Sequence, residues 1–255
     1  MTDETLLQTR SLTKEFRGFR AVSDVDLVVR TGTVHALVGP NGAGKTTLFN
    51  LLTGFLTPTS GTIEYDGQDI TGKRPEDIAH LGIARSFQIT SLFDALTLRE
   101  HLELALASRT GLTMRFWQSV TRFGRFEDRA TALLDQVGLA DLSGLPAGSL
   151  AYGQKRALEL ALALALDPKL LLLDEPTAGM GVEDVDRTIA LVKQVAEGRT
   201  VVLVDHNMHV VGSLAHTVTV LQSGQVLAEG PYEQVRQDPR VVEAYLGTAA
   251  GESHD

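Results

Sequence analysis

The stretch GPNGAGKTT, residues 39–47, constrains the fold of this chain more than any other part of it. It fits the pattern G-x-x-x-x-G-K-[ST], follows the apolar run VHALV and opens the apolar, helix-like run KTTLFNLLTGF. A strand, a glycine-rich loop and a helix in this order are the context that a phosphate-binding loop requires. The glycines let main-chain amides surround phosphate oxygens, Lys45 adds positive charge, and the Thr46 hydroxyl can bind Mg²⁺. We therefore expect the chain to bind a nucleoside triphosphate.

A second motif supplies the acidic groups that a magnesium nucleotide needs. In LLLLDEP, residues 170–176, an apolar run ends in Asp174 and Glu175. A carboxylate at the end of a buried strand helps phosphate-loop proteins to hold Mg²⁺, so Asp174 is the expected metal-side acid. Glu175 follows at the exit of the strand, where it can polarise a water molecule aimed at the γ-phosphate. A lone Asp-Glu pair is usually only a strand end, and the phosphate loop in the same chain is what favours the catalytic interpretation.

Composition narrows the class of protein further. The chain has 255 residues, 43% hydrophobic and 22% charged, as expected of a globular protein with one large domain or two small ones. Its net charge of −9 argues against a nucleic-acid partner, because phosphate binding depends largely on Lys and Arg. The lack of cysteine excludes disulfides and thiolate metal sites. No apolar run approaches the roughly 20 residues of a membrane helix, and MTDETLLQTR has no apolar signal core, so we expect a cytosolic protein.

Apolar runs separated by turn residues predict an α/β chain with a helical middle. Strands are expected at 6–12, 21–30, 170–174 and 200–204, and hairpins at 62–70 and 217–230. The last two single strands are apolar throughout, which is typical of a buried parallel sheet. Helices are expected at 75–82, 96–108, 125–139, 182–198 and in parts of 231–247, with the aromatic-rich stretch 114–123 between the second and the third.

The run SLAYGQKRALEL, residues 149–160, resembles the start of a helix whose N-terminus is free to bind an anion. Ser149 can cap it, Gly153 lets main chain come close, and the leading amides would face the anion. The leucines at 158, 160, 162, 164 and 166 alternate with other residues, which is the period of a strand. Leu and Ala are strong helix formers and the run has no β-branched residue, so we predict a helix buried on most sides.

Together, the phosphate loop, LAYGQKR, LLLLDEP and His206 after the strand TVVLVD resemble the ATP-binding subunits of ABC transporters. The resemblance covers essentially the whole chain and is specific, because the signature stretch is absent from other phosphate-loop families. It implies an α/β fold with a P-loop NTPase core, an antiparallel β subdomain and a helical insertion. It also implies one ABC ATPase domain, 1–255, in which 1–92 and 151–255 form the RecA-like core and the β subdomain. Residues 93–150 would form the helical subdomain, with the signature motif at its end.

The resemblance also implies a role for individual residues. In ABC ATPases the signature helix of one subunit faces the γ-phosphate held by the phosphate loop of the other, so Leu150 would approach the partner's loop near Ala43. Glu175, His206 and Gln88 would be catalytic, and Thr46, Gln88 and Asp174 would hold Mg²⁺. Phe16 would stack on adenine, with Phe19 as its rival. The nucleotide would be contacted by Phe16, Gly39, Pro40, Asn41, Gly42, Ala43, Gly44, Lys45, Thr46, Thr47, Leu150, Ala151, Tyr152, Gly153 and Gln154.

Three departures from the family pattern stand out. Ala151 occupies the position of the usual signature serine, so a hydroxyl contact to the partner's γ-phosphate is missing. Tyr152 replaces the first signature glycine, and Gly181 stands where the loop after the second acid usually carries aspartate. The usual contact of that aspartate across the dimer is therefore in doubt, whereas the groups that we regard as essential are all present.

The segments LAYGQKRALELA, EPTAGM, VDHNM and DPRVVEAYLG are similar to the ATPase subunits of uptake systems for branched-chain and related amino acids. Urea and short-amide uptake systems resemble the chain closely too. The resemblance implies ATP and Mg²⁺ as cofactors, a head-to-tail homo- or heterodimer, transmembrane permease subunits as partners and, indirectly, a solute-binding protein. It implies no nucleic-acid partner and a cytoplasmic location at the inner face of the cell membrane, through the permease.

Two other classes compete with the transport ATPase. A soluble ABC-type ATPase that acts on ribosomes or nucleic acid usually has two nucleotide modules or long coiled coils. This chain has a single phosphate loop, no sustained heptads and no basic tail. An inactive regulatory subunit would have lost Lys45, Glu175 or His206, and all three are present.

Overall fold

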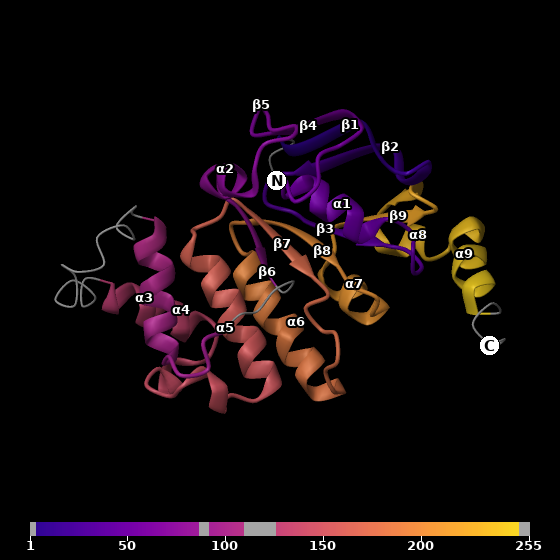
Figure 1. Ribbon diagram of the computed structural model, residues 1–255. Helices are drawn as coiled ribbons and strands as arrows, with labels where there is room; N and C mark the ends of the chain where they lie inside the picture. Colours follow the sequence, from indigo (N-terminus) through magenta and orange to yellow (C-terminus); the bar gives the residue numbers. More distant parts are fainter. Residues whose placement is uncertain (1–3, 87–91, 110–125, 250–255) are drawn as a thin grey trace.

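Two sheets and the helices around them make up the part of the chain that the computed structural model describes, residues 4–86, 92–109 and 126–249 (Figure 1). The strands are β1 (Thr5–Phe16), β2 (Phe19–Arg30), β3 (Val34–Val38), β4 (Ser60–Tyr65), β5 (Gln68–Asp69), β6 (Ile83–Ser86), β7 (Leu170–Asp174), β8 (Thr200–Val204), β9 (Thr217–Gln222) and β10 (Gln225–Gly230). The α-helices are α1 (Lys45–Leu52), α2 (Pro75–His80), α3 (Leu98–Arg109), α4 (Glu127–Gln136), α5 (Tyr152–Ala165), α6 (Val182–Ala196), α7 (Met208–Leu214), α8 (Tyr232–Val235) and α9 (Pro239–Ala249). Gln88 and the stretch 114–123 lie outside the described residues.

The smaller sheet is antiparallel, with the strand order β2-β1-β4-β5. Its β4–β5 turn contains Asp66 at φ 50° and Gly67 at φ 73°, and left-handed backbone at both positions is what a tight two-residue hairpin needs. The predicted hairpin around Asp66-Gly67 is therefore confirmed. The β1–β2 turn repeats this device with Arg17 and Gly18, both at positive φ, and brings Phe16 opposite Phe19.

The larger sheet has the order β10-β9-β3-β8-β7-β6, and all its strands except β10 run parallel. Strand β3, which leads into the phosphate loop, lies next to β8, and β8 lies next to β7. Parallel neighbours end at the same edge of a sheet, so the segments that follow these three strands meet there. The phosphate loop, Asp174 and the residues after Val204 are thus gathered at one edge by the strand order.

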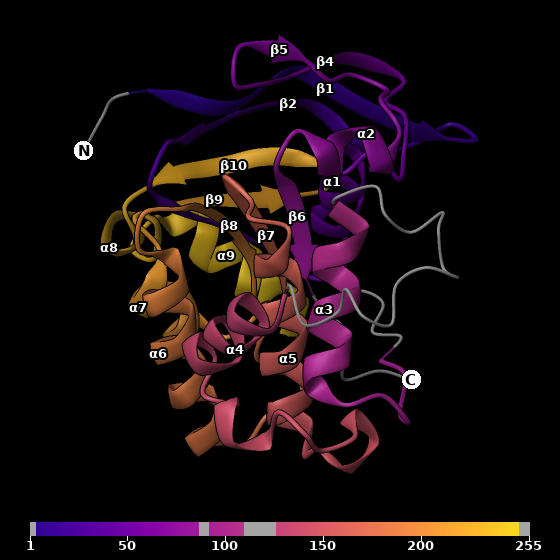
Figure 2. The same cartoon turned by 90° about the vertical axis from the view of Figure 1, so that its left-hand side faces the viewer.

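Both faces of this sheet are covered, which explains why its central strands β7 and β8 are largely apolar and buried along their whole length. Side chains alternate along a strand, so Leu171 and Leu173 pack with α3, α4, α5 and α6 on one face. Leu170 and Leu172 pack on the opposite face with α1 and the antiparallel sheet. Figure 2 shows this division, with β1, β2, β4 and β5 above the larger sheet and α3 to α6 below it.

The alternating leucine run forms α5, as predicted, and not a strand. Leu158, Leu160 and Leu164 are buried together with Ala161, Ala163 and Ala165. A helix whose leucines and alanines are buried around most of its circumference can carry any apolar period, because no polar face interrupts it. Packing between α3, α4 and the sheet therefore explains a pattern that alternation alone would assign to a strand.

The segment between β6 and α5 contributes only helical elements to the described structure. Besides α3 and α4 it contains the short 3-10 turns Ala140–Leu142 and Ala147–Ser149, and one isolated bridge joins Thr97 to Pro146. The leucines of α3 and α4 pack in the same core as α5, α6 and one face of the sheet. The helices of this segment are thus anchored on the sheet through α5.

Candidate nucleotide site

The phosphate loop owes its shape to glycines that no other residue could replace. Gly39 has φ 149° and Gly44 has φ 101°, backbone conformations that side chains disfavour. A Cβ atom at Gly39 would lie 2.2 Å from the main-chain oxygen of Leu221, and one at Gly44 would lie 2.4 Å from that of Ala21. The loop is thus pressed between β9 and β2. Helix α1 begins directly after it without a side-chain cap, so its leading amides are available to an anion.

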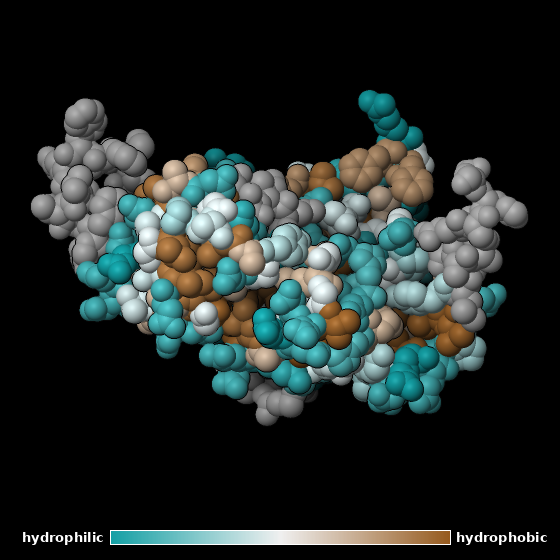
Figure 3. All heavy atoms as spheres, turned by 90° about the horizontal axis from the view of Figure 1, so that it is seen from below, coloured by the Kyte–Doolittle hydropathy of each residue, from teal (hydrophilic) through white to brown (hydrophobic). Residues whose placement is uncertain are grey.

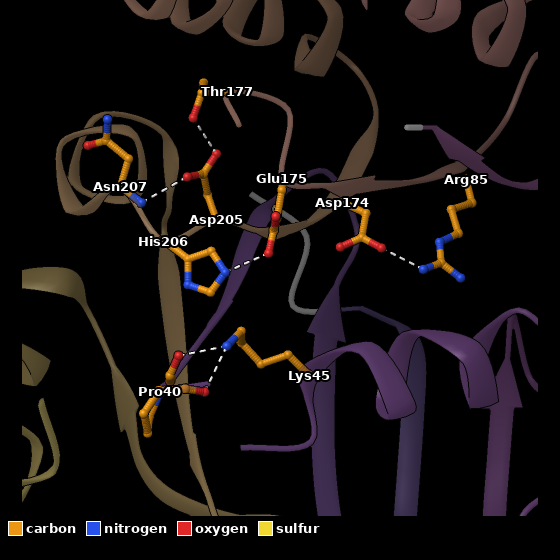
Figure 4. A network of polar contacts seen from close by, with 10 residues as sticks. Pro40, Lys45, Arg85, Asp174, Glu175, Thr177, Asp205, His206 and Asn207 are labelled. Carbon is orange, nitrogen blue, oxygen red and sulfur yellow. Dashed lines mark hydrogen bonds and ion pairs between the residues drawn. The ribbon is translucent and has the colours of Figure 1, made fainter. Parts of the chain in front are cut away.

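Lys45 is held inside the loop and not extended into solvent. Its side chain is buried, and Nζ donates hydrogen bonds to the main-chain oxygens of Gly39, at 2.7 Å, and Pro40, at 3.0 Å (Figure 4). Burial lowers the pKa of Lys45, while the charges of Glu175 and Asp174 act in the opposite direction. A partly desolvated ammonium beside uncapped amides is suited to phosphate oxygens, which would replace the carbonyls as its partners.

Asp174 ends strand β7 and is paired with a residue that the sequence did not point to. Its Oδ2 accepts a hydrogen bond from Nη2 of Arg85 at 2.5 Å, and the two side chains are only 9% and 7% exposed. Arg85 comes from the neighbouring strand β6, and its Nη1 donates to Oδ1 of Asn50 on α1. Arg85 belongs to none of the motifs found in the sequence. The parallel pairing of β6 with β7 is what places it beside the acid.

Glu175 and His206 leave neighbouring strands and meet above the edge of the sheet. Nε2 of His206 lies 2.5 Å from Oε1 of Glu175, and both side chains remain partly exposed. Glu175 has φ 50°, which is uncommon for a residue with a side chain and marks a backbone held by its surroundings. Its amide donates to the main-chain oxygen of Val204, at the end of β8, which fixes this turn against the strand that leads to His206.

Asp205, a second residue that the sequence analysis missed, ties the two loops together. Its carboxylate accepts hydrogen bonds from the Thr177 hydroxyl at 2.7 Å and from the main-chain N–H of Asn207 at 2.8 Å, and it is 4% exposed. Figure 4 shows this pair of contacts above His206 and beside Glu175. An Asp directly before the histidine, at the end of an apolar strand, was the signal that could have identified it. Because it joins both loops, it constrains where the catalytic candidates lie.

The signature helix begins as expected, but its cap is different. Ala151 is the N-cap of α5, and the Ala151 amide donates to Oε1 of Gln154 at 3.0 Å. The prediction that Ser149 caps the helix is wrong, because its hydroxyl donates instead to the main-chain oxygen of Pro146 in the preceding 3-10 turn. No side-chain oxygen caps the first turn of α5, so its leading amides are available, as they are in α1.

Tyr152, which replaces the first signature glycine, contacts the segment that follows Glu175. Its hydroxyl donates to the main-chain oxygen of Ala178 at 3.0 Å and accepts hydrogen bonds from the Arg156 guanidinium. Gly181 is the N-cap of α6 and offers no side-chain cap. Both departures from the family pattern therefore involve the segment between Glu175 and α6: Tyr152 contacts it at Ala178, and Gly181 ends it.

The remaining predicted contacts are brought together only in part. Phe16 and Phe19 lie opposite each other at the β1–β2 turn, 42% and 67% exposed, and Nζ of Lys14 lies 5.1 Å from the centroid of the Phe16 ring. Ala21, on the same hairpin, touches the phosphate loop at Gly44, which places both rings on an element beside the loop. Ala43 and Leu150 are buried within the chain, 2% and 7% exposed. Gln88 lies outside the described residues.

The donor set suits a magnesium nucleotide. Mg²⁺ prefers oxygen ligands and is usually held by one or two protein groups together with substrate phosphates. Thr46, the second residue of α1, carries a hydroxyl, and Asp174 uses only one carboxylate oxygen for Arg85. In Figure 4 the other oxygen of Asp174 points away from Arg85, toward Glu175. The residues present therefore fit both the metal and the triphosphate.

Comparison with known proteins leads to the same class. A family model described as ABC transporter matches residues 22–178, from β2 through the segment after Glu175. The chain belongs to the ABC transporter family. A second model, described as branched-chain amino acid ATP-binding cassette transporter, matches residues 225–251 of this ABC cassette. The α/β P-loop fold expected from the sequence is confirmed, and the chain is an ATP-binding cassette ATPase.

Full-length relatives of this ABC cassette carry transport names. The high-affinity branched-chain amino acid transport ATP-binding protein BraF of Pseudomonas aeruginosa is 39% identical over 96% of this chain and 98% of its own length. LivG of Escherichia coli, with the same description, is 37% identical over 96% of this chain and 99% of its own. These relatives support the transport class and not the soluble ribosomal or nucleic-acid class.

Solved cassettes share the fold over nearly the whole chain. The ADP conformation of an ATP-binding cassette of an ABC transporter aligns with a TM-score of 0.85 at 30% identity, covering 95% of this chain and 99% of that one. A nucleotide-free cassette aligns at 0.83 and 30%, covering 94% and 98%. The ABC cassette thus belongs to a group that binds nucleotide in this fold. Within residues 4–86, 92–109 and 126–249, no helix is long and apolar enough to cross a membrane.

Proposed function

We propose that this ABC cassette is the ATP-hydrolysing subunit of an uptake system for branched-chain or related amino acids. The observation that carries the proposal is the combination of two matches. Relatives named for branched-chain amino acid transport align over 96% of the chain, and the C-terminal segment 225–251 matches a model described for the same transporters. The segment covers β10, α8 and α9, which lie outside the part matched by the general ABC model.

The site supports hydrolysis by positioning and charge. Lys45 and the amides at the start of α1 bind the phosphates. Thr46, Asp174 and Gln88 would hold Mg²⁺, which would supply charge neutralisation for the transferred phosphoryl group. Glu175 orients a water molecule and accepts its proton, and His206 fixes the Glu175 carboxylate through their hydrogen bond. No covalent intermediate is needed, because phosphoryl transfer is catalysed mainly by positioning and electrostatics.

The second set of free amides, at the start of α5, completes the site of another subunit. Ala151, Tyr152, Gly153 and Gln154, which follow the buried Leu150, face the γ-phosphate held by the partner's phosphate loop, so the active form is a head-to-tail dimer. Both homodimers and heterodimers satisfy this arrangement. Within each subunit, residues 1–92 and 151–255 form the RecA-like core with the β subdomain, and residues 93–150 form the helical subdomain. Phe16 stacks on the adenine.

The cassette works at the cytoplasmic face of a membrane through permease subunits, and a solute-binding protein delivers the amino acid. Viewed from the side of the helices, the surface carries several apolar patches between polar residues (Figure 3). Phe93 and Leu145, in the segment between β6 and α5, are 62% and 45% exposed. Contiguous apolar patches on a surface favour a protein partner. We assign the permease contact to this segment and to Gln88.

Uptake in the source organism tests the proposal. Cells whose only copy of the gene encodes Glu175→Gln are expected to lose uptake of labelled leucine, isoleucine and valine, while the variant still binds ATP. Cells with Glu64→Gln, which changes an exposed acid of the antiparallel sheet, provide the matched control. Unchanged uptake of these amino acids in the first strain would overturn the assignment, and loss of urea or amide uptake instead would identify a different solute class.

A further inference from the structure

Arg85 is a cation with a largely buried side chain beside the candidate site, and the chemistry proposed above does not use it. Its Nη2 donates to Oδ2 of Asp174 at 2.5 Å, and the side chains are 7% and 9% exposed. Most ion pairs among the described residues are far more exposed, such as Lys169 with Asp66 at 65% and 47%. The pair therefore needs an explanation beyond surface charge.

The guanidinium is fixed from two further sides. Nη1 donates to Oδ1 of Asn50 at 2.6 Å, and the ring centroid of Phe49 lies 5.5 Å from the guanidinium carbon. Asn50 follows Thr46 by four residues on α1, so the two side chains lie on one face of the helix, one turn apart. Arg85 thus bridges β6, β7 and the helix that presents the metal-side hydroxyl.

Charge explains the placement. A buried carboxylate without a counter-ion is costly, and breaking a buried pair by removing one partner is strongly destabilising. Asp174 carries this charge whether or not a nucleotide is bound, whereas Mg²⁺ arrives and leaves with the nucleotide. Nε of Arg85 and Oγ of Ser86 are buried without a hydrogen-bond partner in the described part of the chain. The guanidinium is therefore held by Asp174 and Asn50, without saturating its own donors.

We propose that Arg85 is the resident counter-cation of Asp174: it neutralises this carboxylate in the nucleotide-free cassette and weakens the attraction of the carboxylate for Mg²⁺. Arg85 is a positioning residue, because it acts on the metal through Asp174. The inference rests on the proposed function, which takes Asp174 as the metal-side acid. Coupling between two ligands of one group is reciprocal, so removal of Arg85 must raise what Mg²⁺ contributes to binding.

Nucleotide affinity with and without metal tests the proposal. The dissociation constant of a fluorescent ATP analogue is measured in EDTA and in Mg²⁺, and the ratio of the two constants reports the contribution of the metal. In Arg85→Met this ratio is expected to exceed the wild-type ratio by about 5- to 150-fold, the usual range of coupling between sites. Lys169→Met, which breaks an exposed ion pair, should keep the wild-type ratio. A ratio in Arg85→Met equal to or below that of the wild type would overturn the role of Arg85.

Two further variants separate the possible failures. Asp174→Asn should reduce the effect of Mg²⁺ and remove the difference between the wild-type and Arg85→Met backgrounds, because Arg85 acts on the metal only through Asp174. If the wild type itself shows no effect of Mg²⁺, the assignment of the metal site in the proposed function fails, and the role of Arg85 fails with it. Thermal unfolding in EDTA gives a readout without metal: the midpoint of Arg85→Met should fall, and Arg85→Met/Asp174→Asn should recover it. If the single variant does not fold, a folded double variant supports the proposal, whereas an unfolded double variant shows that Arg85 acts through packing and overturns it.

Discussion

Nε2 of His206 lies 2.5 Å from Oε1 of Glu175, although the two residues are 31 positions apart in the chain. The contact exists because β7 and β8 are parallel neighbours, so the residues that follow them emerge side by side. The Asp205 carboxylate connects the two loops, because it accepts hydrogen bonds from the Thr177 hydroxyl after β7 and from the main-chain N–H of Asn207 after β8. The candidate base is therefore fixed by main-chain and side-chain contacts from two strands.

Glu175→Gln should reduce ATP turnover by roughly 10²- to 10⁴-fold, the usual size of the loss of a general base. The amide keeps the shape of the side chain and leaves Asp174 and Arg85 untouched, so ATP binding should survive. Steady-state phosphate release and equilibrium ATP binding check the two parts, with Glu64→Gln as the control. Turnover within a few-fold of the wild type would show that Glu175 is not the base.

Lys45→Ala should weaken both ATP binding and turnover. The variant removes the ammonium that the structure places on the oxygens of Gly39 and Pro40, where phosphate oxygens would compete for it. Equilibrium titration with a fluorescent ATP analogue measures the loss, and Lys169→Ala removes an exposed ammonium for comparison. Equal affinity in Lys45→Ala and the wild type would contradict the assignment of Lys45 to the phosphates.

Cross-linking tests the head-to-tail dimer, but not at the positions first suggested by the sequence. Ala43 and Leu150 are 2% and 7% exposed, so cysteines there would face the interior of the chain. Their neighbours Asn41 and Ala151 are exposed and lie on the same two segments. Because the chain has no cysteine, Asn41→Cys and Ala151→Cys in a Glu175→Gln background introduce the only thiols.

Mild oxidation of this variant with ATP should give a species of dimer size on a non-reducing gel. A disulfide requires Cα atoms within about 7 Å, a condition that we expect only in the closed dimer. Each single-cysteine variant is a control, and for a heterodimer the two cysteines are divided between the subunits. Bridging that is indifferent to ATP in both arrangements would mean that the start of α5 serves another contact.

Tyr152→Phe should destabilise the chain by roughly 0.5 to 1.5 kcal/mol, the net contribution of a typical hydrogen bond. The variant removes the hydroxyl that donates to the main-chain oxygen of Ala178 and accepts from Arg156, while the ring remains. Urea unfolding measures the difference. Tyr232→Phe is the matched control, because no hydrogen bond of the Tyr232 hydroxyl is found among the described residues. An equal effect of both changes would show that the Tyr152 hydroxyl does not hold the segment after Glu175.

His35 makes stability depend on pH in a defined window. It lies in β3, and burial lowers its pKa from 6.5 to about 4. The Thr219 hydroxyl donates to Glu229, so His35 donates from Nε2 to Thr219 and is neutral in the folded chain. Protons bind more readily to the unfolded chain, so stability is present above pH 6.5 and is lost as the pH falls toward 4, by up to about 3 kcal/mol.

His35→Gln removes this titration and keeps a donor for Thr219. The free energy of unfolding of the wild type should therefore fall more steeply than that of the variant between pH 6.5 and 4. Chemical unfolding at several pH values in this range measures the difference, in which the contributions of the carboxylates common to both chains cancel. Parallel curves for the two proteins would show that His35 does not titrate in this way.

The phosphate loop, the Asp174-Glu175 pair and the start of α5 could be predicted from the sequence, because each is a local device. The chemistry of a glycine-rich turn, of a carboxylate at a strand end and of an uncapped helix start depends only on consecutive residues. The hairpin at Asp66-Gly67 was predictable for the same reason. Composition fixed α5 as a helix, since no β-branched residue interrupts its leucines and alanines.

Residues whose role depends on a neighbour from another strand could not be found in this way. Arg85 meets Asp174 only because β6 pairs with β7, and Asp205 joins the loops of Glu175 and His206 only because β7 pairs with β8. Serine is a residue type that can cap a helix, but the Ser149 hydroxyl donates to the main-chain oxygen of Pro146 in the preceding 3-10 turn instead. The burial of Ala43 and Leu150 is likewise a property of packing. The sequence by itself determined which groups the chain offers to a nucleotide, whereas only the tertiary structure decided their partners, because strand order brings together residues that the chain keeps far apart.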